Sequence, residues 1–182
     1  MDIFTLNYDG TIEIFCDKHG ISYSDGFDPD WHPDAFKAAK IRIYKLHGSL
    51  YWLKSESGKI IRIPVKSLPI RQVKYWTDEN ISEMMIYPAL QKDKQSDVYL
   101  WLSRRFMDKL SAANTLVVIG YSFRDREIFE TILSAMHRNK NLWLVIVSPR
   151  ASQHKSELSS RCCHSVKNVL KDNRQMIVDL LR

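Results

Sequence analysis

Two side chains of this sequence could act on a sugar: His47, within Lys-Leu-His-Gly-Ser, and Asn7, within Thr-Leu-Asn-Tyr-Asp. An imidazole titrates close to neutral pH, so it can accept a proton from a ribose hydroxyl. An Asn amide can hold a water or a hydroxyl beside a sugar carbon that gains positive charge. Each residue also has a structural interpretation, because most histidines are not catalytic and Asn-Tyr-Asp-Gly favours an Asx turn.

Both residues follow segments that read as strands, and the second half of the chain alternates strand, helix and strand. Its two strands are apolar throughout, which is typical of a parallel sheet covered on both faces. Residues 20–34 predict an ordered loop in which Phe27 and Trp31 pack on neighbouring elements, and residues 50–90 predict a small β-hairpin or loop insertion. We predict strands at 2–7, 41–46, 50–53, 59–64, 84–88, 116–120 and 142–147, and helices at 11–19, 96–113, 125–137, 152–160 and 173–181.

Ligands of such sheets bind beyond the carboxyl ends of the strands, where four of the predicted strands end in polar or glycine-containing turns. We therefore expect these turns to converge on one site. Gly120 links a strand to a helix, where free N–H groups and the positive helix end attract a phosphate or ribose, and Gly48 allows close approach to His47. In the alternative interpretation Gly120 is only a tight turn, and Ser122 is only a helix cap followed by the first-turn acid Asp125.

The composition is that of one ordinary globular domain, with 182 residues and a net charge of +6. The basic residues are scattered, so nucleic-acid binding is not expected. Three cysteines without a disulfide spacing and the lack of a leader segment predict a reducing, cytoplasmic location, and the longest apolar run is too short to cross a membrane. The spacing of Cys162, Cys163 and His164 does not suit a metal, so no zinc is expected.

The motifs Thr-Leu-Asn-Tyr-Asp, Lys-Leu-His-Gly-Ser and Val-Ile-Gly-Tyr-Ser-Phe-Arg-Asp, in this order, resemble the sirtuin-like NAD-consuming superfamily, in versions similar to its bacterial and phage-defence NADase branch. The resemblance implies a single α/β domain over residues 1–182, with a Rossmann-like parallel sheet, helices on both faces, and NAD as substrate. His47 would be the general base and Asn7 would position water or ribose. Positions expected near NAD are Thr5, Asp9, Gly48, Gly120, Ser122 and Ser148, the last standing where relatives often have Asn.

Two features of the resembling families are missing from the sequence. Sirtuin deacetylases carry a four-cysteine zinc module after the His-Gly motif, whereas no cysteine lies between Cys16 and Cys162. Family members also begin with a Gly-rich strand-loop-helix, so we expect this chain to be N-terminally incomplete, the C-terminal part of the fold.

We therefore predict an NAD glycohydrolase that forms ADP-ribose and nicotinamide, in the setting of anti-phage defence. The alternatives are a non-catalytic NAD- or ADP-ribose-binding regulatory module or truncated remnant and, third, a protein deacetylase, which the missing cysteines disfavour. Expected partners are NAD or ADP-ribose, together with further copies of the chain or further domains of a longer protein.

Overall fold

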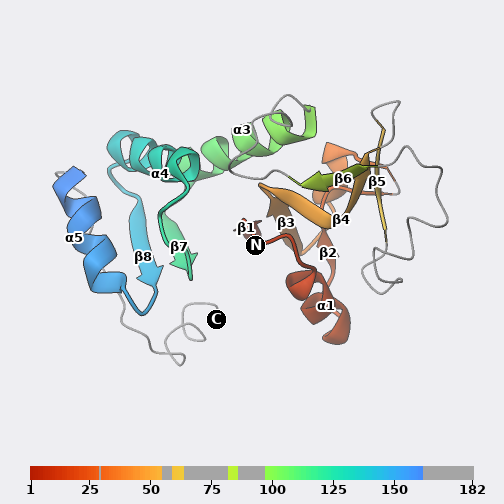
Figure 1. Ribbon diagram of the computed structural model, residues 1–182, viewed down its shortest axis with the longest axis horizontal. Helices are drawn as coiled ribbons and strands as arrows, with labels where there is room; N and C mark the ends of the chain where they lie inside the picture. Colours follow the sequence, from red (N-terminus) through yellow and green to blue (C-terminus); the bar gives the residue numbers. More distant parts are fainter. Residues whose placement is uncertain (29, 55–58, 64–81, 86–96, 162–182) are drawn as a thin grey trace. The chain divides into compact units, whose positions relative to one another are not determined.

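The computed structural model describes residues 1–28, 30–54, 59–63, 82–85 and 97–161, which Figure 1 draws as ribbon. The chain divides into two compact units, Met1–Arg104 and Arg105–Arg182. Both units contain parallel strands and helices, which confirms the predicted α/β class. The first unit contains β1 (Asp2–Thr5), α1 (Thr11–Lys18), β2 (Tyr23–Ser24), the 3-10 helix η1 (Pro33–Phe36), β3 (Ile41–Lys45), β4 (Gly48–Lys54), β5 (Ile60–Arg62), β6 (Ser82–Met85) and the first half of α3 (Asp97–Ala112).

The first three strands of this unit form a parallel sheet in the order β1-β3-β2. The register places Thr5, the last residue of β1, opposite Lys45, the last residue of β3. Cys16 of α1 packs with Ile41 and Ile43 in a buried core. The predicted strands at 2–7 and 41–46 and the predicted helix at 11–19 are therefore confirmed. The carboxyl ends of the two strands lie at the same edge of the sheet.

The segment predicted as an ordered loop, residues 20–34, also contributes the short strand β2 and the start of η1, neither of which has a recognisable periodicity. The predicted packing of its aromatic residues is confirmed. The ring of Phe27 lies 5.4 Å from that of Trp31 and 5.2 Å from that of Trp52, measured between centroids. Phe36 stacks on both Tyr44 of β3 and Trp101 of α3, with centroid distances of 4.5 and 5.4 Å. This aromatic cluster holds the loop against β3 and β4.

The predicted hairpin is confirmed, because β4 pairs antiparallel with β5, and β6 joins the other edge of β4. Most of the expected insertion at 50–90 lies outside the described residues, as does the helix predicted at 173–181.

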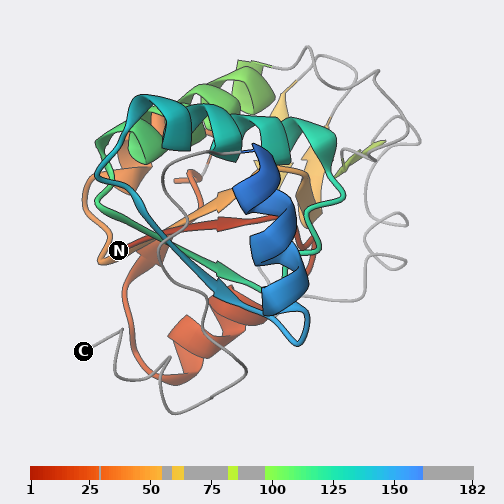
Figure 2. The ribbon, with the colours of Figure 1, turned by 90° about the vertical axis from the view of Figure 1, so that its left-hand side faces the viewer.

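The second unit contains β7 (Thr115–Ile119), α4 (Arg126–Arg138), β8 (Trp143–Val147) and α5 (Ala151–Arg161), as well as the end of α3. β7 and β8 pair in parallel, with α4 as the connection, as the sequence predicts. The apolar face of α4 is buried, and α5 lies alongside β8 in both Figure 1 and Figure 2. None of the described helices combines the length and the apolarity needed to span a bilayer.

The two strands of this sheet differ in burial. Residues 144–147 of β8 are all buried, as expected for a strand that is covered on both faces. In β7 only Val118 is buried, whereas Val117 is 37% and Ile119 59% exposed. The prediction of a strand that is covered on both faces therefore holds for β8 within the second unit.

Candidate functional site

The segments that carry Asn7 and His47 follow two neighbouring parallel strands. The hydrogen-bond ladder continues past the end of the strands, since the Leu46 N–H donates to the Thr5 carbonyl at 3.0 Å. His47 then occupies the short junction between β3 and β4 and is half-buried. Both predicted catalytic residues therefore lie just beyond the same edge of one sheet.

Three backbone carbonyls of residues 5–9 are hydrogen-bonded by donors from residues 45–50. The Tyr8 carbonyl accepts from the Leu50 N–H at 3.0 Å and from the Ser49 hydroxyl at 3.3 Å. The Asp9 carbonyl accepts from the Lys45 ammonium. The rings of Tyr8 and His47 have centroids 6.3 Å apart. These contacts hold the turn that carries Asn7 directly against the segment that carries His47.

The Asn7–Gly10 turn is held by the side chains of Thr5 and Asp9 and not by the side chain of Asn7. The Asn7 N–H donates to the Thr5 hydroxyl oxygen at 3.0 Å, and the Thr11 N–H donates to the Asp9 carboxylate at 2.9 Å. The hydrogen bonds from Thr11 hold the pKa of Asp9 below its usual value, and Lys45 acts in the same direction. Asn7 is exposed, and its amide makes no hydrogen bond to another described residue. The Asx turn that would explain this sequence structurally therefore involves Asp9, which leaves the Asn7 amide available to a ligand.

Gly48 has a backbone requirement of its own. Its φ of +82° lies in the region that favours glycine, and it is buried at the start of β4, opposite Met85 of β6. The glycine is thus needed for the chain to turn from β3 into β4 beside His47.

In the second unit, the loop between β7 and α4 carries the predicted residues Gly120 and Ser122. Gly120 is exposed with a φ of +66°, and a Cβ atom added there would meet no atom within 4 Å. The alternative interpretation, in which Ser122 caps the helix, is wrong, because the carboxylate of Asp125 accepts from the Ile128 N–H at 3.1 Å as the N-cap of α4. Ser122 is exposed and has no capping role. The Asp125 carboxylate brings negative charge to this helix end, which makes it a poor place for phosphate.

Two further polar groups near these strand ends have structural partners. The Ser148 hydroxyl accepts from the Arg150 N–H at 3.1 Å and so holds the turn before α5. The Tyr121 hydroxyl donates to the Asp125 carbonyl at 2.8 Å, and burial raises the pKa of Tyr121 well above its usual value. These contacts account for both side chains without a ligand.

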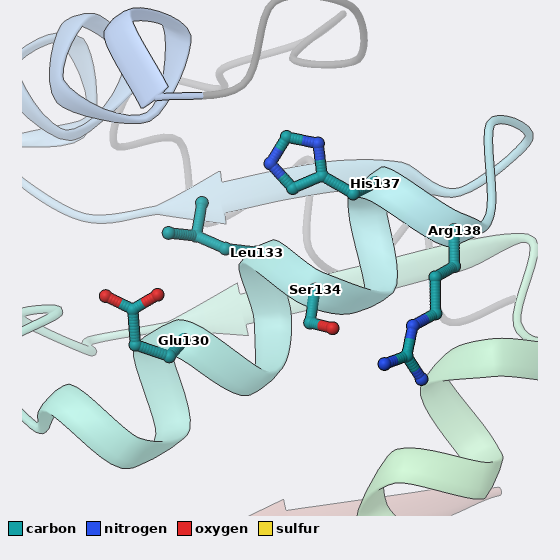
Figure 3. A pocket seen from close by; sticks show the side chains of 5 residues that line it. All are labelled: Glu130, Leu133, Ser134, His137 and Arg138. Carbon is teal, nitrogen blue, oxygen red and sulfur yellow. The ribbon is translucent and has the colours of Figure 1, made fainter.

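The predicted site residues thus fall into two groups. One group comprises Thr5, Asn7, Asp9, His47 and Gly48 in the first unit, and the other Gly120, Ser122 and Ser148 in the second. The convergence of all four strand ends stays a prediction. Figure 3 shows a surface hollow elsewhere, formed by five residues of α4 alone, and its charged side chains are all exposed.

Sequence reasoning missed a buried ion pair next to the first group. The Lys45 ammonium lies 2.9 Å from a carboxylate oxygen of Glu13, and each side chain is only 1% exposed. The signal was present in the sequence: Lys45 continues the alternation of Ile41 and Ile43, whose side chains face the core. A charged residue at such a position predicts a buried partner.

Within the described residues, no three His, Cys, Asp or Glu side chains are grouped so that they could hold a metal ion, and Cys162, Cys163 and His164 lie outside them.

Comparison with protein families finds a match to the model described as SIR2-like domain, over residues 2–166. No curated protein sequence matches the chain significantly. The family match includes all eight predicted site residues.

Proposed function

The chain belongs to the SIR2-like domain family, and from this premise we propose that it binds NAD and hydrolyses the bond between nicotinamide and ribose. The family supports an NAD-related function, and the contacts around Asn7 and His47 support the choice of the reacting groups. The observation that carries the proposal is the set of hydrogen bonds from residues 45–50 to the carbonyls of Thr5, Tyr8 and Asp9. They hold an exposed amide and an imidazole on one rigid frame, which is what chemistry on a bound sugar requires.

In the proposed reaction His47 accepts a proton from a hydroxyl of the nicotinamide ribose while the glycosidic bond breaks. Nicotinamide leaves as a neutral molecule, and the ribose carbon passes through an oxocarbenium-like state. The Asn7 amide holds the water that adds to this carbon; the water returns one proton to the ribose oxygen, and His47 releases the proton that it accepted to solvent. The products are nicotinamide, ADP-ribose and one proton, so the charge of the pyridinium is balanced.

The other residues have supporting roles in this proposal. The Asp9 carboxylate, whose pKa is held below its usual value by the hydrogen bonds from Thr11, would lie near the cationic nicotinamide. Thr5 fixes the Asn7 backbone, and Gly48 fixes the turn beside His47. In the second unit, Gly120 and Ser122 would contact a ribose hydroxyl in preference to a phosphate, because Asp125 occupies the helix end. Ser148 would contribute through its backbone, since its hydroxyl is engaged.

The biological setting proposed for this activity is anti-phage defence, in which NAD is depleted after activation by further copies of the chain or by further domains.

The test is release of nicotinamide from NAD by the purified chain and by its His47→Ala variant. General-base catalysis contributes about 10²–10⁴-fold, so the variant is expected to lose at least about a hundredfold in turnover. His32→Ala is the matched control, because His32 is an exposed histidine of the same unit that is not among the predicted site residues. Turnover that survives in His47→Ala at the wild-type rate would refute the assignment.

Calorimetric titration with NAD and ADP-ribose distinguishes the alternative function. Binding of either molecule without release of nicotinamide supports a non-catalytic binding module. Release of nicotinamide only in the presence of an acetylated peptide supports a deacetylase.

A further inference from the structure

The buried ion pair of Lys45 and Glu13 contacts the turn that carries Asn7. Lys45 ends β3, two residues before His47, and Glu13 lies in the first turn of α1, directly after the Asn7–Gly10 turn. Among the described residues, the Lys45 ammonium contacts the Glu13 carboxylate at 2.9 Å and donates to the Asp9 backbone carbonyl. One cation thus joins the strand, the helix and the turn.

The pair is poorly explained by stability alone. Burying two charges removes their hydration, and well-packed apolar replacements of similar volume are often neutral or stabilising. The second carboxylate oxygen of Glu13 is buried without a hydrogen-bond partner among the residues that the structure describes. An apolar pair would fill the same volume without leaving this oxygen unsatisfied. What an apolar pair cannot supply is a directed donor to the Asp9 carbonyl.

The position of the donor decides where the turn lies. Leu50 and Ser49 already fix the position of the Tyr8 carbonyl. The hydrogen bond to the Asp9 carbonyl therefore sets how the turn is oriented about Tyr8. Glu13 orients the ammonium, because a Lys side chain with four rotatable bonds has no fixed direction of its own. The orientation of the exposed Asn7 amide relative to His47 therefore depends on both members of the pair.

We propose that Lys45 and Glu13 are positioning residues for the reaction at Asn7 and His47: the pair holds the Asp9 carbonyl and thereby sets the geometry of the catalytic turn. This role rests on the proposed NAD hydrolysis. It predicts that removal of the pair lowers kcat more than it lowers the free energy of unfolding or the affinity for substrate.

The test compares two charge-free versions of the pair in the full chain. Lys45→Met with Glu13→Leu removes charge and donor, whereas Lys45→Gln with Glu13→Gln removes charge but keeps an N–H donor that can reach toward the Asp9 carbonyl. Arg42→Met with Asp2→Leu is the matched control, because this second ion pair of β3, at 2.6 Å, joins β3 to β1 at the opposite end of the strands from the turn.

We expect the Met/Leu variant to keep the denaturant midpoint of the wild type and its KM within about threefold, but to lose about ten- to a hundredfold in kcat, the range that misplacement of about 1 Å produces. The Gln/Gln variant should recover most of that loss, and the control should keep its kcat. A Met/Leu variant that is folded and fully active would overturn the proposal, as would one that cannot fold at all.

Amide hydrogen exchange without NAD provides a readout that does not depend on activity. The Asn7, Thr11 and Leu50 amides donate to atoms of the segment Thr5–Asp9. Their exchange should accelerate at least about tenfold in the Met/Leu variant and stay unchanged in the control. If the wild-type chain releases no nicotinamide, the proposed function fails, and the exchange rates alone then decide the positioning role. Unchanged exchange in the Met/Leu variant would refute it.

Discussion

Replacing Gly26 by Ala tests how rigidly the aromatic cluster holds its loop. Gly26 has a φ of +94°, where an L-residue costs about 1–2 kcal/mol. The new Cβ would overlap the Trp31 ring and lie 2.8 and 2.9 Å from ring carbons of Phe36. These rings cannot move aside easily, because each packs on further aromatic rings, and overpacking of a core costs about 1–3 kcal/mol. The two contributions together predict a loss of about 2–5 kcal/mol.

Gly20→Ala is the matched control for this substitution. Gly20 has a similar positive φ of +62° in the same unit, but an added Cβ would meet nothing within 4 Å. It should therefore lose only the backbone contribution of about 1–2 kcal/mol. Urea unfolding followed by tryptophan fluorescence measures both variants, because Trp31 and Trp52 report on the cluster itself. Equal loss of stability in the two variants would contradict the close packing of Trp31 and Phe36 around Gly26.

Two further predictions concern the turns at the strand ends. Asp125→Ala should destabilise the chain by about 1 kcal/mol through loss of the α4 N-cap, whereas Ser122→Ala should leave the melting temperature unchanged. A lower melting temperature for Ser122→Ala than for Asp125→Ala would contradict the capping geometry. Because the folded state lowers the pKa of Asp9, its contribution to stability is present above the unfolded pKa of about 4 and is lost as the pH falls below it. The stability difference between wild type and Asp9→Ala, measured by urea unfolding, should therefore narrow from pH 7 to pH 3, and a constant difference would refute the role of the Thr11 hydrogen bond.

Much of the fold follows from the sequence because its periodicities are strong. The apolar runs of β7 and β8 and the spacing of apolar residues in α4 identify a parallel unit that the structure confirms. β2 and η1 were not predictable in the same way. β2 has two residues, and η1 forms because Phe36 stacks on Tyr44 and Trp101, partners that are distant in sequence. Tertiary packing, which local propensity does not encode, decides such elements.

The sequence predicts which candidate residues follow the strands but not the contacts that these residues make. Chemistry-bearing residue types at the ends of predicted strands made Asn7 and His47 the candidates, and the parallel register places the segments that carry them at one edge. The alternative interpretation placed the helix cap at Ser122 instead of Asp125, because both are good capping residues and only the actual start of α4 decides between them. The role of Lys45 depends on where its ammonium points, which only the folded arrangement of α1 and β3 reveals.

The two groups of predicted residues differ in what their side chains are free to do. Around Asn7 the turn is held largely through backbone carbonyls, which accept from Lys45, Leu46, Ser49 and Leu50, so the exposed amide need not maintain the fold. In the second unit the Ser148 hydroxyl is itself a structural contact, because it accepts from the Arg150 N–H. A residue that supports the backbone through its side chain cannot change its hydrogen bonds during a reaction without loosening that support. On the proposed reaction, the Asn7 amide can therefore change its hydrogen bonds without loosening the turn that carries it.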